Sequence, residues 1–310
     1  NNSWSQLGAD IDGEAAGDLC GYSASLSSDG SRVAIGAFNN DGNGSNSGHV
    51  RIYQFNNNSW SQLGTDINGE AADDYSGYSV SLSSDGSRVA IGAFNNDGNG
   101  TTSGHVRIYQ YNNNSWSQLG DDINGEAADD RSGFSVSLSS DGSRVAIGAY
   151  RNGGNGNLSG HVRIYQYNNN SWSQLGADID GEAENDVSGW AVSLSSDGTR
   201  VAIGAGNNDG NGDNSGHVRI YGYNGSAWAQ VGADIDGEAA GNQSGRSVSL
   251  SSDGSIVAIG APFNNENGTN SGHVRVYSIS SGDSYQYAWD VDSGGAPSDG
   301  TYTVTVTGAD

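Results

Sequence analysis

The stretch GYSVSLSSDGSRVAIGAF, residues 77–94, decides the fold. Residues 78–82 alternate polar with apolar side chains, which is the period-two pattern of a β-strand. The Ser-Ser-Asp-Gly segment at 83–86 follows, and Asp-Gly between alternating runs is a strong signal for a hairpin. Residues 88–93 then read as a second strand, with small residues where neighbouring sheets must approach closely.

The residues that follow complete a four-stranded unit. An Asn- and Gly-rich loop at 95–100 leads to a third strand at 105–109. A polar turn at 112–114 leads to a fourth strand at 116–119, and the acidic stretch 122–126 then connects to the next copy of the pattern. Since no segment has helical periodicity, the unit predicts an antiparallel sheet of four short strands.

This unit recurs five times in strict register, every 56 residues. The recurrence is seen in three sets of residues: Trp4, Trp60, Trp116, Trp172 and Trp228; His49, His105, His161, His217 and His273; and Asp29, Asp85, Asp141, Asp197 and Asp253. Four antiparallel strands per repeat are typical of a β-propeller blade. The alternative, a β-solenoid of parallel coils, has little use for a tight hairpin in every copy.

The ends of the repeat predict how the blades are completed. The chain opens with a lone fourth strand at 4–7, and the fifth copy supplies its first three strands up to residue 277. We therefore expect a five-bladed β-propeller over 1–277, closed by the N-terminal strand, which would leave no open sheet edge. Residues 278–310 form a β extension with alternating runs at 285–291 and 301–306; an incomplete sixth blade is the alternative.

Composition excludes several classes of function. The formal net charge is −24, and the 12 basic residues are all Arg. An acidic surface repels phosphate backbones and anionic lipids, so we expect neither nucleic-acid binding nor direct membrane insertion. Cys20 is the only cysteine, which rules out an intrachain disulfide and a Cys-based zinc site. The acidity instead suits divalent cations.

Residues 77–94, continued by 103–109, resemble the FG-GAP repeat of integrin α-subunit propellers and bacterial surface proteins. Gly133-Phe134 and residues 259–262 match its Phe-Gly and Gly-Ala-Pro elements. The resemblance implies a secreted or cell-surface propeller used in adhesion or recognition, often with calcium. Integrin-type repeats carry their calcium loop where this chain has only the 83–86 turn, and they usually form seven blades. The end of the chain resembles an immunoglobulin-like module.

Strand alternation assigns the loops to two faces. The loops between second and third strands, and those between one repeat and the next, share a face that we call the top. Carboxylates and amides around glycine suit calcium, although Asn, Asp and Gly are also common in tight loops. The calcium candidates are Asp10, Asp12, Glu14, Asp18, Asp41, Asn43, Asp97, Asn99, Asp209 and Asn211.

The repeated His and Trp residues have structural interpretations. A ring of five equivalent His residues is poor geometry for zinc, which needs four ligands close together, so we interpret them as strand residues bonding a neighbouring blade. The Trp of each fourth strand is interpreted as packing between blades rather than as a sugar platform.

A few positions differ strongly between copies and gather near the ends of the first and second strands. Large aromatic residues and Arg are enriched at protein-recognition surfaces. The alternative is that these positions vary through sequence drift in exposed loops. These candidate ligand-binding residues are Leu19, Tyr22, Phe38, Tyr75, Tyr78, Phe94, Arg131, Phe134, Tyr150, Arg151, Val187, Trp190, Gln243, Arg246 and Phe263.

The sequence thus predicts a non-catalytic module that binds a protein or a glycan at a cell surface through its top face. Two alternatives remain, a lectin with repeated glycan sites and a structural spacer in a large surface protein. An enzyme is not expected, because every recurring acid, His or Ser appears in each repeat, whereas one active site needs an asymmetric constellation.

Overall fold

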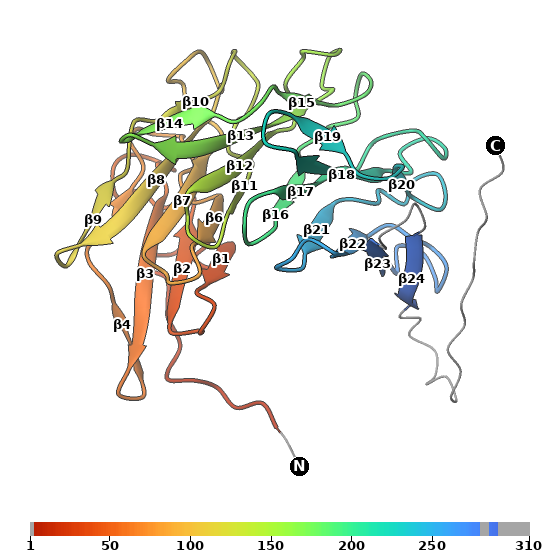
Figure 1. The fold of residues 1–310 in the computed structure, drawn as a ribbon. Helices are drawn as coiled ribbons and strands as arrows, with labels where there is room; N and C mark the ends of the chain where they lie inside the picture. Colours follow the sequence, from red (N-terminus) through yellow and green to blue (C-terminus); the bar gives the residue numbers. More distant parts are fainter. Residues whose placement is uncertain (1–2, 280–284, 291–310) are drawn as a thin grey trace. The chain divides into compact units, whose positions relative to one another are not determined.

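In the computed structural model, residues 3–279 and 285–290 are described, the latter by their backbone. Regular secondary structure within these ranges consists of β-strands (Figure 1). The chain divides into two compact units, which are described separately: residues 1–149 with 164–174, and residues 150–163 with 175–310. No helix among the described residues is long and apolar enough to cross a membrane.

The strands fall into four sets that follow the repeat. The first strands are β1 (Ser23–Leu26), β6 (Ser79–Leu82), β11 (Ser135–Leu138), β16 (Ala191–Leu194) and β21 (Ser247–Leu250). The second are β2 (Arg32–Ala37), β7 (Arg88–Ala93), β12 (Arg144–Ala149), β17 (Arg200–Ala205) and β22 (Ile256–Ala261). The third are β3 (His49–Asn56), β8 (His105–Asn112), β13 (His161–Asn168), β18 (His217–Tyr223) and β23 (His273–Ile279). The fourth are β4 (Ser59–Gln62), β9 (Ser115–Gln118), β14 (Ser171–Gln174), β19 (Trp228–Gln230) and β24 (Tyr285–Asp290).

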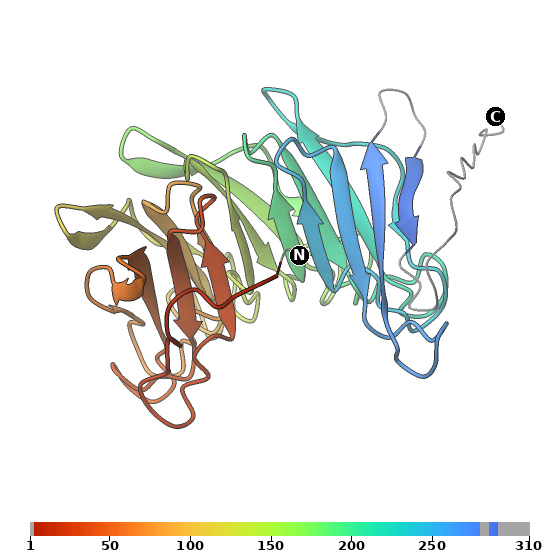
Figure 2. The same ribbon diagram turned by 90° about the horizontal axis from the view of Figure 1, so that it is seen from below.

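Each repeat forms one antiparallel sheet in the order first, second, third, fourth strand, which confirms the predicted β-propeller blades. In the second sheet, for example, Val80 lies opposite Ile91, and Ile91 lies opposite Arg107. Figure 2 shows the fifth sheet, in blue, with its strands side by side and alternating in direction.

The acidic connections hold short strands that the sequence pattern did not predict. They are β5 (Ile67–Asn68), β10 (Ile123–Asn124), β15 (Ile179–Asp180) and β20 (Ile235–Asp236). Each pairs with the beginning of its repeat's third strand, as His105 does with Asn124. The connections are therefore fixed against the sheet, and so are their carboxylates.

Successive sheets approach closely at glycines in the second strands. A Cβ atom on Gly36 would lie 2.0 Å from the carbonyl oxygen of Gly77 in the next sheet, so only glycine fits there. The same carbonyl oxygen accepts a hydrogen bond of 2.7 Å from Ser23 Oγ. The predicted need for small residues at this position is confirmed.

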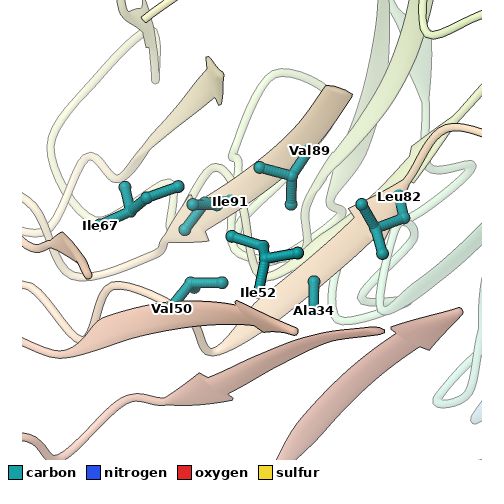
Figure 3. Close-up of a cluster of buried hydrophobic side chains, with 7 residues drawn as sticks. All are labelled: Ala34, Val50, Ile52, Ile67, Leu82, Val89 and Ile91. Carbon is teal, nitrogen blue, oxygen red and sulfur yellow. The ribbon is translucent and has the colours of Figure 1, made fainter. Parts of the chain in front are cut away.

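Aliphatic side chains fill the space between sheets (Figure 3). Ala34, Val50 and Ile52 of the first sheet pack against second-sheet residues and β5, forming a cluster that is completed by Ile67, Leu82, Val89 and Ile91. Because each fully buried aliphatic side chain contributes roughly 1.5–3 kcal/mol, a repeated cluster of this kind is the main stabilisation of the stack.

In the first four repeats, a tryptophan of the fourth strand also bonds the segment that precedes its repeat. Trp116 Nε1 on β9 donates a hydrogen bond of 2.7 Å to Leu63 O, which follows β4, and Trp60, Trp172 and Trp228 make equivalent bonds. Packing between blades was the interpretation given to these residues, and the geometry confirms it.

The ends of the chain differ from the expected closure. Residues 3–7 form no strand, and the fourth place in the fifth sheet is taken by β24, which pairs with β23. The reason is local: β24 follows β23 after a short connection, so its pairing closes a small loop, whereas residues 3–7 have no preceding strand of their own. The predicted strand at 301–306 lies outside the described residues.

The repeat provides a matched test of packing between sheets. Leu82 is 7% exposed, whereas Leu26, at the same position of the first repeat, is 61% exposed. We expect Leu82→Ala to lower the free energy of unfolding by roughly 2–5 kcal/mol, because it leaves a cavity between sheets. Leu26→Ala should cost less than about 1 kcal/mol in dilute solution. Equal losses in urea titrations would contradict this packing.

Candidate metal centres

The five repeated histidines begin the third strands, in the middle of their sheets. His105 lies opposite Ala93 of β7 on one side and opposite Asn124 of β10 on the other. Its side chain is 1% exposed. The sheet therefore fixes the imidazole from both edges and removes it from solvent.

Each of the first four histidines faces one carboxylate from the connection before its repeat and one from the connection after it. His105 Nδ1 lies 3.8 Å from Glu70 Oε2 and 3.9 Å from Asp122 Oδ2. The ligand atoms of this triad all lie within 4.8 Å of one another. His105 Nδ1 is buried and makes no hydrogen bond. A buried imidazole nitrogen directed at two carboxylates is a donor set suited to a divalent metal.

The same arrangement occurs in other repeats. Complete triads are formed by Glu14, His49 and Asp66 and by Glu182, His217 and Asp234. His161 Nδ1 lies 4.0 Å from Asp178 Oδ2. In the fifth repeat Glu266 takes the place of the Asp, beside His273 and Glu238.

Two side chains position the glutamate of the triad. Arg107 lies two residues after His105 on β8, and its Nη1 is 3.1 Å from Glu70 Oε1 while its Nη2 donates to Asn68 O at 2.9 Å. Asn43 Nδ2 donates to the main-chain oxygen of Glu70 at 2.9 Å. The glutamate thus keeps one oxygen on the arginine and turns the other toward His105.

Burial sets the charge state of the histidines. Burial, and then the neighbouring Arg107, lower the pKa of His105 to about 4, although Asp122 acts in the opposite direction. The pKa of His217 is lowered by the same causes, burial first and Arg219 second. The imidazoles of His105 and His217 are therefore neutral at pH 7, which is the form that binds metals.

A small cavity adjoins the second triad. It has a volume of about 150 Å³, and Asp122 belongs both to its wall and to the triad. The lining residues are Asp121, Asp122, Ile123, Asn124, Tyr165, Ser171 and Trp172. A cavity of about 170 Å³ at the equivalent place next to Asp178 has Tyr221 and Trp228 in its wall.

Sequence reasoning missed these triads because it compared the histidines only with one another. They do not form a common site; each has its own carboxylates. The available signal was the constant spacing of a Glu 35 residues before and an Asp 17 residues after His49, His105 and His217. That spacing becomes meaningful only once β5 and its equivalents bring the connections against the third strand.

Of the acidic residues proposed for calcium, Glu14 alone is part of a His-containing triad among the described residues. Several others stabilise their own loops. Asp18 Oδ2 accepts hydrogen bonds from Ala15 N and Asn40 Nδ2, and Asp10 Oδ1 accepts one from Gln6 Nε2. A main-chain N–H of the same loop donates a hydrogen bond to the carboxylate of Asp41, Asp97 and Asp209. The side-chain amides of Asn43, Asn99 and Asn211 donate to main-chain oxygens of the next connection. The main-chain oxygen of Asp12 accepts a hydrogen bond from Arg51.

The residues that vary between copies come together within each unit. In the first unit, the ring of Tyr78 packs on those of Tyr22, Phe94 and Phe134 at centroid distances of 4.9, 4.5 and 4.9 Å. Phe38, Tyr75 and Arg131 join this group.

In the second unit, Tyr150 packs on Trp190, and Arg246 lies over the Trp190 ring at 4.0 Å. Gln243 accepts a hydrogen bond from Arg246, whereas Phe263 is 39% exposed and Val187 is buried. Leu19 is half exposed, and Arg151 is partly buried. Ligand binding by these residues stays a prediction.

Comparison with known families finds the FG-GAP repeat at residues 68–109 and 234–277. FG-GAP repeats are thus present in this chain, as the resemblance indicated. No curated protein matches it.

The fold is shared with solved enzyme structures. Hydrazine synthase of Kuenenia stuttgartiensis has 13% identity and a TM-score of 0.54, over 83% of this chain and 64% of that chain. The periplasmic gluconolactonase PpgL of Pseudomonas aeruginosa has 15% identity and a TM-score of 0.57, over 89% and 73%. A presumed 6-phosphogluconolactonase of Bacteroides uniformis ATCC 8492 has 13% identity and a TM-score of 0.50, over 86% and 84%. At such identities the likeness establishes the fold alone.

These similarities correct the functional prediction. A non-catalytic adhesion module, with a lectin or spacer as alternatives, was expected, and an enzyme was not; both expectations are wrong, since the similar structures are of enzymes. The error came from treating fivefold recurrence as evidence against catalysis. A repeat supplies the same His and carboxylates to each sheet, while the residues around them differ between copies.

The lowered histidine pKa predicts a pH effect on stability in the presence of a chelator. Because the folded-state pKa of His105 is about 4, the unfolded chain binds more protons than the folded one between pH 6.5 and 4. The free energy of unfolding should therefore decrease as the pH is lowered from 6.5 to 4, by roughly 3 kcal/mol for this residue. In His105→Asn that part of the loss should disappear. Identical slopes for both proteins in urea titrations would refute the assignment.

Proposed function

We propose that this chain is a metal-dependent hydrolase of small, uncharged cyclic esters such as sugar lactones. The proposal rests above all on one observation: Asp122 belongs both to the Glu70–His105–Asp122 triad and to the wall of an aromatic-lined cavity. A metal held by the triad would therefore lie beside a space of the right size for a small ring.

The donor set favours a transition metal over calcium. One neutral imidazole and two carboxylates make three protein ligands, which leaves coordination positions open, as in catalytic sites. Imidazole suits Zn²⁺ or Mn²⁺ better than Ca²⁺, which prefers six to eight oxygen ligands. Such a metal polarises an ester carbonyl and acidifies water. Glu70, oriented by Arg107, and Asp122 would hold it against His105.

The cavity supports a single-ring, neutral substrate. Its volume of about 150 Å³ equals that of about five water molecules in the liquid. Trp172 and Tyr165 offer apolar surface for a ring, while Asp121, Asn124 and Ser171 offer hydrogen-bonding groups for hydroxyls. The net charge of −24 disfavours a phosphorylated substrate. Of the two lactonase structures that share the fold, this argument favours the substrate type of the gluconolactonase.

The proposal is tested by lactone hydrolysis with a matched pair of variants. Asp122 and Asp178 each border a cavity, whereas Asp10, at the same repeat position, is in none of the His clusters among the described residues. With Zn²⁺ or Mn²⁺ added to chelator-treated protein, hydrolysis of glucono-δ-lactone should exceed the spontaneous rate. In Asp122→Asn/Asp178→Asn, kcat/KM should fall at least tenfold, because the metal loses a ligand; Asp10→Asn should stay within about twofold.

Calorimetry of metal binding separates the two parts of the proposal. Binding of Zn²⁺ or Mn²⁺ that is weakened in the double variant supports the metal sites whether or not a lactone is turned over. If no metal raises hydrolysis above the spontaneous rate, the hydrolase assignment fails. If Ca²⁺ alone binds and activates, the choice of metal is wrong.

A further inference from the structure

The fifth repeat differs from the others in the loop between β22 and β23. Residue 266 of this loop is a glutamate, and residue 265 is an asparagine. The other repeats have glycine at the position of Glu266: Gly42, Gly98, Gly154 and Gly210. The loop hydrogen bond is kept, since Asn265 Oδ1 accepts a bond of 2.7 Å from Asn270 N and the aspartate at this position in the fourth repeat accepts the equivalent one. The fifth repeat therefore carries its loop carboxylate one residue later.

In the other repeats this position has little room for a side chain. A Cβ atom on Gly98 would lie 2.9 Å from Asn96 Oδ1 and 3.0 Å from Asn124 Oδ1, which belongs to the connection after the repeat. Glu266 N donates a hydrogen bond of 2.9 Å to Asn264 Oδ1, as the glycine does in the other repeats. With the backbone held in the same way, the Glu266 side chain leaves the loop toward the place that the next connection occupies elsewhere.

The glutamate completes a cluster around the last of the repeated histidines. Ligand atoms of Glu238, Glu266 and His273 all lie within 4.8 Å of one another. His273 Nδ1 is 3.5 Å from Glu238 Oε2, and its side chain is 10% exposed. The other ring nitrogen, Nε2, is buried and makes no hydrogen bond. A buried polar atom without a partner is costly, and a bound ligand of this imidazole would offset that cost.

The cluster is complete within one compact unit, because Glu238, Glu266 and His273 all belong to residues 175–310. A single arginine faces it: Arg275 Nη1 lies 3.6 Å from Glu238 Oε1, while its Nη2 donates to Asp236 O. One guanidinium beside two carboxylates leaves a negative charge next to the imidazole. This field favours a cation.

We propose that Glu238, Glu266 and His273 bind a divalent transition metal that links the loop of residues 262–272 to the beginning of β23. One imidazole and two carboxylates suit Zn²⁺ or Mn²⁺. The site has no part in the proposed hydrolysis, and its third ligand comes from the repeat's own loop rather than from the connection after it. Because the ligands come from three segments, the metal holds them together and opposes local opening of the loop.

Hydrogen exchange read by mass spectrometry tests this site in the full chain. Zn²⁺ added to chelator-treated protein at roughly ten times its Kd should slow amide exchange in residues 262–272 about tenfold. Glu266→Gly restores the residue of the other repeats, and Glu266→Gln keeps the size of the side chain; both should lose this slowing. Each variant is compared with itself with and without metal, so a change in loop flexibility alone does not alter the outcome.

A variant of another repeat separates this site from the proposed hydrolase. Asp122→Asn removes a ligand of the second triad and should leave the slowing at residues 262–272 unchanged. The proposal is overturned if neither Zn²⁺ nor Mn²⁺ slows exchange in the wild-type loop, or if both Glu266 variants keep the full effect.

Discussion

The structure depends on how closely the backbone of one sheet approaches the next. At Gly36 and Gly92, the position where a side chain would begin is 2.0 Å from a carbonyl oxygen of the following sheet. This approach brings the serine hydroxyls of β1 and β6 within hydrogen-bond distance of the same carbonyl oxygens. It also lets short aliphatic side chains close the space between sheets. Because the spacing is set by backbone, every repeat must keep the same residues there.

That constraint also explains why the candidate metal centres recur. Once the sheets are held at this distance, the connection before a repeat and the connection after it both pass the start of its third strand. The connection before it brings Glu70 to His105, and the connection after it brings Asp122. The triad is thus a product of the stacking, and its recurrence carries no information for or against catalysis. What differs between repeats is the residues around each triad, such as Asp121 in one cavity and Ala177 in the other.

The blades were predictable from sequence because their determinants are local. Period-two alternation, the Asp-Gly turn and the 56-residue recurrence specify four antiparallel strands, and β6 and β7 lie at the expected residues. The triads were not predictable in this way, because their members lie 35 and 17 residues apart and meet only through the two-residue strand β10 and its equivalents. Strand pairing at the chain ends was also missed, since residues 3–7 have the repeated pattern but form no strand, and β24 takes the fourth place in the fifth sheet.

The distribution of charge links the fold to the kind of ligand. The chain has 12 arginines against 36 acidic residues, and many of the arginines bind within the protein. Arg32 and Arg88 donate to main-chain oxygens of the next sheet, and Arg107 binds Glu70 and Asn68. Little positive charge is therefore left at the surface to balance the carboxylates. The uncompensated carboxylates create a negative field that attracts cations and repels anions, and the neutral imidazoles in that field are donors for metals. The stacking that uses these arginines therefore also biases the molecule toward metals and uncharged substrates.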